Sequence, residues 1–134
     1  MENPYLDLVG KVLKLSPEIR FASISNMFGE IKYSKNKTGV KLLLTHKESR
    51  SSLESATRSW NLRNSLSPKI GKGEFVIAQY GKIKRITIPL GPEHLLYLTT
   101  TKKADHNKII KKATKLKLGK LKKKSKVKQK LVIP

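Results

Sequence analysis

The chain has 134 residues, 37% of them hydrophobic, which predicts one domain of ordinary size and leaves no room for a second core. Lys and Arg number 30 against 9 Asp and Glu, and the resulting formal charge of +21 favours contact with polyanions. The absence of cysteine excludes a disulfide framework and a cysteine-based zinc site, and we expect an intracellular, cytoplasmic location.

The first segment has the spacing of an amphipathic helix. Its apolar residues fall at i, i+3, i+4, i+7 and i+8, and Ser16-Pro17 ends the pattern, so a helix is expected over about 4–15. The start lacks a basic segment followed by an apolar one, and no apolar run approaches the ~20 residues of a membrane span. Secretion and membrane insertion are not expected. The stripe residues are Tyr5, Leu8, Val9, Val12 and Leu13.

A β-hairpin is predicted next. The stretch Ile19–Ser25 alternates, with Ile19, Phe21 and Ser23 on one side and Arg20, Ala22 and Ile24 on the other. Residues 26–29 have turn chemistry, and a return strand is expected over 30–35. Residues 35–39 are polar and indicate a loop. Residues 40–44 fit either a short strand or the opening turn of a helix.

A second helix is expected over about 46–66. Thr45 with Glu48, and Ser51 with Glu54, both fit a capping box, and a narrow apolar stripe follows. That stripe contains Trp60, for which a core position is favoured over a role in stacking a nucleic-acid base. Ser67-Pro68 and the run Gly71-Lys72-Gly73 break the helix.

Three apolar runs then follow, at 75–80, 83–90 and 94–101, joined by Gly81-Lys82 and Gly91-Pro92. Connections this short permit only antiparallel neighbours, which predicts a three-stranded meander. A last helix is expected from an Asp105 N-cap, with Gly119 as its stop. The whole is an α+β fold of order α-β-β-α-β-β-β-α: an antiparallel sheet of about five strands flanked by helices, with a domain over 1–118 and a basic tail over 119–134.

Lysine dominates the end of the chain. The first 101 residues hold 16 basic and 8 acidic residues, net +8, whereas the remainder holds 14 and 1, net +13. Lysine acts as a point charge while arginine offers a fork that reads guanine, so the tail favours phosphate contact without sequence specificity. The candidate polyanion-binding residues are Lys111, Lys112, Lys115, Lys117, Lys120, Lys122, Lys123, Lys124, Lys126, Lys128 and Lys130.

Two other interpretations of the tail stay open. Blocks of like charge are commonly solvated, disordered extensions. Contact of the tail leucines with lipid is less favoured because no aromatic anchor accompanies them. A further basic surface is predicted at Lys82, Lys84 and Arg85, which could equally be charges that protect a sheet edge from aggregation.

Catalytic chemistry is poorly represented, and the chain is not expected to be an enzyme. His46, His94 and His106 have no metal-ligand spacing, so neither a metal nor a cofactor is expected. The run Gly71-Lys72-Gly73 lacks the remaining residues of a P-loop, no serine stands in a nucleophile-elbow context, and the carboxylates are scattered singly.

Four motifs carry a family resemblance: Ile19-Arg20-Phe21-Ala22, Trp60-Asn61-Leu62-Arg63, Lys84-Arg85-Ile86-Thr87-Ile88-Pro89-Leu90 and Asp105-His106-Asn107-Lys108-Ile109-Ile110. With them, residues 4–116 resemble an uncharacterised family of small proteins from ammonia-oxidising archaea. The element order is similar to that of roadblock/dynein-light-chain domains, which have a profilin-like or PAS-like sheet. That resemblance implies a non-catalytic adaptor that forms homodimers and scaffolds small GTPases, and it carries over no catalytic or ligand residue.

Three functional hypotheses follow. The first is a folded domain that presents a lysine-rich arm to DNA or RNA, with affinity that falls steeply with salt. The second is a roadblock-type scaffold whose second helix and an edge strand contact a partner or a second copy. The third is a small-molecule sensor with a PAS-like pocket beneath the sheet, which requires a cavity there.

Overall fold

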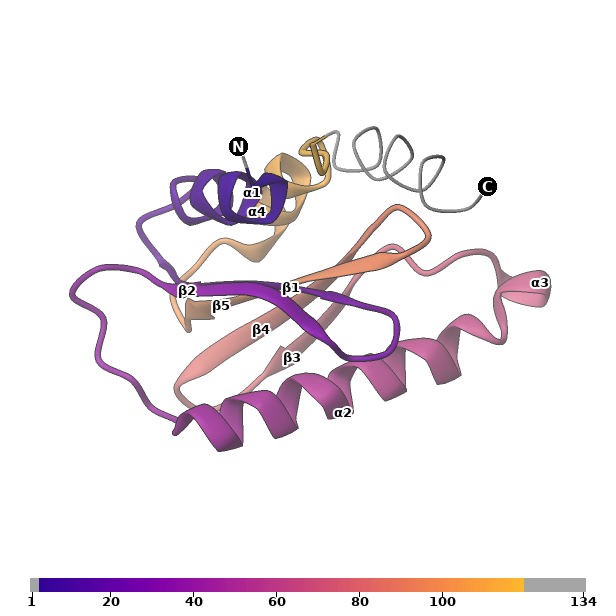
Figure 1. The fold of residues 1–134 in the computed structure, drawn as a ribbon, viewed down its shortest axis with the longest axis horizontal. Helices are drawn as coiled ribbons and strands as arrows, with labels where there is room; N and C mark the ends of the chain where they lie inside the picture. The colour runs from indigo at the N-terminus through magenta and orange to yellow at the C-terminus, as the bar shows by residue number, and fades with distance from the viewer. Residues whose placement is uncertain (1–2, 120–134) are drawn as a thin grey trace, which may run out of the picture.

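The computed structural model describes residues 3–119, which form a five-stranded antiparallel sheet with helices on both faces (Figure 1). The predicted fold class and order of elements are confirmed, with one short additional helix, α3. The elements are α1 (Pro4–Leu13), β1 (Ile19–Asn26), β2 (Ile31–Asn36), α2 (His46–Asn64), α3 (Ser67–Ile70), β3 (Val76–Gln79), β4 (Ile83–Leu90), β5 (His94–Thr101) and α4 (His106–Ala113).

The strand order is β2-β1-β5-β4-β3. The predicted meander is present, since β4 pairs antiparallel with both β3 and β5. The β1–β2 hairpin joins it because β1 pairs antiparallel with β5, so the last strand lies at the centre of the sheet. The two edges are therefore β2 and the four-residue strand β3.

One face of the sheet is covered by α1 and α4, whose buried residues belong to the same apolar core (Figure 1). Asn3 caps α1 by accepting the Tyr5 and Leu6 backbone N–H groups, and Asp105 caps α4 as predicted by accepting the N–H of Lys108. The larger apolar core lies beneath these helices. Its fully buried side chains include Val9, Val12, Ile24, Ile86, Leu96, Leu98 and Ala113.

Of the helices within residues 3–119, α2 is the one that crosses the opposite face (Figure 1). The predicted Thr45–Glu48 capping box is formed, and it fixes the start of this helix. The other candidate pair, Ser51 and Glu54, lies inside the helix. Among its 19 residues α2 buries only Leu53, Thr57 and Trp60, which is little for a helix of five turns.

A polar network fastens α2 to the sheet where apolar contacts are few. The fully buried Tyr97 of β5 hydrogen-bonds through its hydroxyl to the Thr57 hydroxyl, and it accepts a hydrogen bond of 3.2 Å from Ser25 of β1. Thr57 also lies 2.9 Å from the Leu53 carbonyl oxygen. Because hydrogen bonds are directional, this network sets the position of the helix along β1 and β5.

Three local predictions need correction, and a fourth needs an addition. Ile19 packs with Ala22 and Ile24 under α1, because the β1–β5 register shifts between Ile19 and Phe21 and interrupts the expected alternation. Residues 40–44 form neither strand nor helix. The predicted break is present, since α2 ends at Asn64, but an additional helical turn, Ser67–Ile70, follows it. Pro68 fits this turn because it lacks only an N–H that a first turn leaves unbonded. The last helix ends at Ala113, well before Gly119.

Candidate functional site

The free edge of β3 is the first candidate site. This strand pairs only with β4, so the backbone groups along its outer side have no strand partner within residues 3–119. Phe75, just before the strand, is 43% exposed, and Tyr80, just after it, is 52% exposed. An uncovered edge strand flanked by exposed aromatic residues can pair with another strand.

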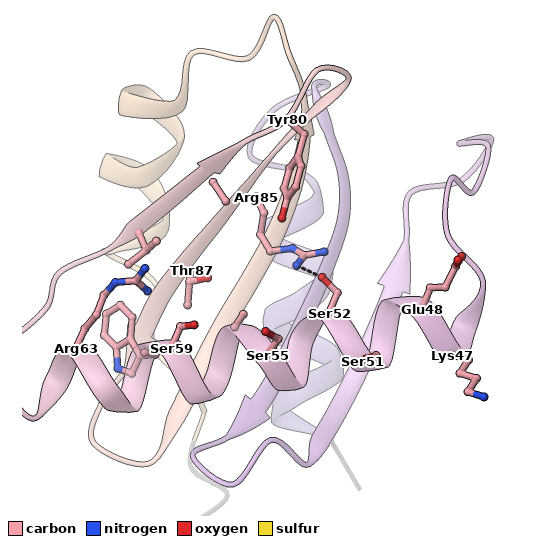
Figure 2. A pocket seen from close by; sticks show the side chains of 14 residues that line it. Lys47, Glu48, Ser51, Ser52, Ser55, Ser59, Arg63, Tyr80, Arg85 and Thr87 are labelled. Atoms are coloured by element: carbon pink, nitrogen blue, oxygen red, sulfur yellow. Dashed lines mark hydrogen bonds between the residues drawn. The ribbon is translucent and has the colours of Figure 1, made fainter.

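A groove of about 620 Å³ lies between α2 and strands β3 and β4 (Figure 2). It has the size of a small-molecule site. Its α2 wall is mostly hydroxyl groups, which recur because residues at i, i+4 and i+8 share one side of a helix. The hydroxyl residues that line it are Ser51, Ser52, Ser55 and Ser59 from α2 and Thr87 from β4.

The charges around this groove are mainly positive. Lys47, Arg63 and Arg85 line it together with one acid, Glu48. The Glu48 carboxylate is already engaged, because it accepts the Thr45 backbone N–H at 2.9 Å in the capping box. The groove therefore offers cations and hydroxyl groups to a ligand, and little negative charge.

Arg85 lies at the centre of the sheet wall, and its guanidinium points toward α2 (Figure 2). The side chain is only 7% exposed. Nη1 donates a hydrogen bond to the Ser52 hydroxyl, whereas the buried Nε has no hydrogen-bond partner in the described part of the chain. Burial lowers the pKa of Arg85, an effect that Tyr80 and Tyr97 partly oppose.

The predicted basic surface at Lys82, Lys84 and Arg85 does not exist as one patch. Only Lys82, in the turn, is exposed; Lys84 and Arg85 are each 7% exposed. Successive residues of a strand point to opposite faces, so Lys84 lies under α4 and Arg85 under α2. The Lys84 ammonium donates to the Ala104 carbonyl at 2.8 Å and lies 3.0 Å from His106 Nδ1.

The structure places four of the eleven candidate polyanion-binding lysines. Lys111, Lys112, Lys115 and Lys117 are exposed on α4 and just after it. Lys120, Lys122, Lys123, Lys124, Lys126, Lys128 and Lys130 lie outside the described residues. Leu116 and Leu118 pack against the larger core, so the folded part of the chain extends through this segment.

The histidines are separate from one another. The described residues contain no group of His, Asp and Glu that could hold a metal. His94 lies 3.0 Å from the Tyr5 hydroxyl, and burial lowers its pKa. Trp60 is 5% exposed, as a core position predicts. Within residues 3–119, no helix has the length and apolar character needed to span a bilayer.

The sequence contains a signal for the groove that metal-ligand and catalytic motifs do not reveal. Serine is a weak helix former, yet four serines occur within nine residues of α2. Arg85 and Thr87 occupy alternate positions of β4, where the strand pattern assigns both to one face. The fold brings the serines of α2 and these two residues of β4 together, which their separation in the sequence does not predict.

Similarity to solved structures lies at the level of the fold. The chain superimposes on the gliding protein MglB of Thermus thermophilus with a TM-score of 0.70 at 14% identity, covering 86% of this chain and 85% of that one. An MglB with a tetrameric arrangement gives the same score and coverage at 15% identity. A roadblock/LC7 domain from Streptomyces avermitilis gives 0.65 at 14% identity, covering 80% and 86%. No protein-family model and no curated protein sequence matches the chain.

Proposed function

We propose that this protein is a non-catalytic, homodimeric protein-interaction scaffold of the roadblock type. The observation that carries the proposal is the free edge of β3, which lies beside α2 and is flanked by exposed aromatic residues. Pairing of two β3 strands from two copies would satisfy both edges and bring the α2 helices close together.

The fold comparisons support an assembly function. One of the similar MglB structures has a tetrameric arrangement. The roadblock resemblance implies small GTPases as the class of protein that such a dimer would hold. The scaffold needs no catalytic residues, which agrees with the scattered carboxylates of the sequence.

The scaffold proposal predicts that Phe75→Glu weakens self-association. Phe75 is 43% exposed, so the domain should still fold, but two glutamates would face each other near a paired β3 edge. We expect the dimer dissociation constant, measured by sedimentation velocity in 0.3 M salt, to rise at least about tenfold, equivalent to about 1.4 kcal/mol.

Phe28→Glu is the matched control. Phe28 is 89% exposed in the turn between β1 and β2, so the same substitution there adds the same charge away from the β3 edge. It should leave the dissociation constant unchanged. A parent chain that is monomeric at high micromolar concentration, or equal effects of both variants, would refute the proposed interface.

The polybasic arm remains a second candidate, carried by the charge of +13 beyond residue 101 and by the exposed lysines after α4. We expect the full chain to bind duplex DNA and structured RNA with an affinity that falls by about 10³ or more between 50 and 200 mM salt if six or more phosphates are contacted. Titration of fluorescent duplexes across this range measures the effect.

A full-length variant whose arm lysines are replaced by glutamine tests the charge of the arm separately, because the substitution removes the positive charge without shortening the arm. It should lose most of the affinity and the steep salt dependence while the fold is retained. If the parent chain does not bind at 150 mM salt, or if the variant binds equally well, the arm does not bind nucleic acid. The variant replaces Lys120, Lys122, Lys123, Lys124, Lys126, Lys128 and Lys130 with glutamine.

A further inference from the structure

The groove between α2 and strands β3 and β4 contains a buried cation without a counter-charge. Arg85 is only 7% exposed, and the ion pairs among residues 3–119 are Lys11–Asp7 and Lys32–Glu30, neither of which involves it. A buried charge is strongly destabilising unless it is paired and fully hydrogen-bonded. The fold therefore bears a cost at Arg85 that an anion in the groove would relieve.

The hydrogen-bonding state of Arg85 points to the same conclusion. A guanidinium has five N–H donors in a fixed plane. Here Nη1 donates to Ser52, while the buried Nε has no acceptor among residues 3–119. The guanidinium faces the groove, so an anionic oxygen bound there would lie close to its positive charge (Figure 2).

The surroundings of Arg85 suit an oxyanion. Hydroxyl groups of Ser55 and Ser59 line the same groove, and each can donate to a ligand oxygen. Arg63 and Lys47 add positive charge along its length. Serine is unfavourable in the interior of a helix, so the groove-lining serines of α2 run against helix propensity. Residues that break a local preference in this way are commonly found at functional sites.

The groove is much larger than an inorganic ion needs. At about 620 Å³ it has room for an organic group beside the anion. Val76, Ala78 and Tyr80 line it as well, and they supply apolar surface to such a group. The site therefore suits a small organic molecule with an anionic head.

We infer that this groove binds a small organic ligand bearing a phosphate or carboxylate group, and that the guanidinium of Arg85 holds the anionic group with help from the α2 hydroxyls. This inference goes beyond the scaffold proposal, since it concerns the interior of the groove rather than the β3 edge. It gives the domain a ligand-responsive site beside its proposed interface.

Inorganic phosphate and acetate are the probes, each titrated into the ¹⁵N-labelled full chain at constant ionic strength set with chloride. Because tail lysines also attract anions, the readout is specific to position: saturable shifts of the Arg85 Nε–H and of the Ser52, Ser55 and Thr87 amides. Phosphate alone shifting these signals indicates a phosphate ligand, and acetate acting equally indicates a carboxylate ligand. Either result supports the site, whereas shifts confined to lysines or matched by chloride overturn it.

Arg85→Met is the direct variant, and Arg58→Met is its matched control on the exposed side of α2. We expect Arg85→Met to reduce the groove affinity at least tenfold and Arg58→Met to leave it unchanged. Ser55→Glu covers the case in which Arg85→Met fails to fold. Ser55 is exposed, and a glutamate there would offer Arg85 a carboxylate and abolish the anion-dependent shifts. Unchanged affinity in Arg85→Met, or in Ser55→Glu where the former does not fold, would overturn the inference.

The dimer and the anion site can be tested apart. Repeating the phosphate titration with Phe75→Glu shows whether association affects the groove. Equal site-specific shifts in the parent and this variant support a site that is independent of the dimer. Shifts that appear only in the variant would mean that a second copy fills the groove in the parent, which would overturn the ligand proposal while leaving the scaffold intact.

Discussion

Leu96→Ala is expected to lower the free energy of unfolding by about 2–5 kcal/mol. Leu96 is fully buried on β5, the central strand, within the core beneath α1 and α4. Loss of the side chain leaves a cavity that the surrounding strands cannot close, because β5 is held by β1 on one side and β4 on the other. Urea denaturation followed by far-UV circular dichroism measures the change.

Leu6→Ala provides the comparison for this prediction. Leu6 lies on α1, and its side chain is 50% exposed, so the same substitution leaves no closed cavity. We expect a change below about 1 kcal/mol. If the two variants were destabilised equally, the larger cluster would not be the principal core of the domain.

The parts of the fold that the sequence predicts well are those with a local physical cause. The Thr45 and Asp105 caps are formed because each side chain can reach the backbone N–H three residues on. The meander follows from connections too short for parallel strands. In both cases the deciding interaction lies within a few residues along the chain.

The features that local patterns could not predict depend on distant contacts. The position of β5 between β1 and β4 depends on contacts between distant segments, and no periodic pattern in the sequence predicts it. The register shift at Ile19 has the same character, since alternation alone assigned Ile19 to the face of Phe21. At Ile19, packing against α1 and pairing with β5 determine the direction of the side chain, and the alternating pattern of the strand does not.

The candidate site was predicted only in part. The sequence directed attention to lysine, and it grouped Lys84 with Arg85 as a basic surface. The fold separates them because one lies under α4 and the other faces the α2 groove. The α2 serines and Arg85 are far apart in sequence, and they form a site only because α2 lies across β4. The spacing of residues along the sequence could therefore not predict which residues would line a pocket beneath the sheet.

Trp60→Ala is expected to lower the free energy of unfolding by about 3–5 kcal/mol. Trp60 is one of only three buried residues of α2, and it packs in the smaller core with Leu53, Leu95 and Tyr97. It also lies against the backbone at Gly73, where an added Cβ would come within 3.2 Å of the indole ring. Removing the ring therefore loosens both α2 and the segment that leads into β3.

The same variant decides between the core and base-stacking roles of Trp60. Because the ring is 5% exposed, it is not available to a nucleic-acid base, and the affinity for single-stranded DNA per folded molecule should be unchanged. Trp60→Phe is the control: it keeps an aromatic ring, so we expect a smaller loss of stability than with alanine. Far-UV circular dichroism must follow unfolding, since Trp60 is the only tryptophan. Unchanged stability together with an affinity loss of about 1–3 kcal/mol would instead identify Trp60 as a stacking platform that the fold exposes on binding.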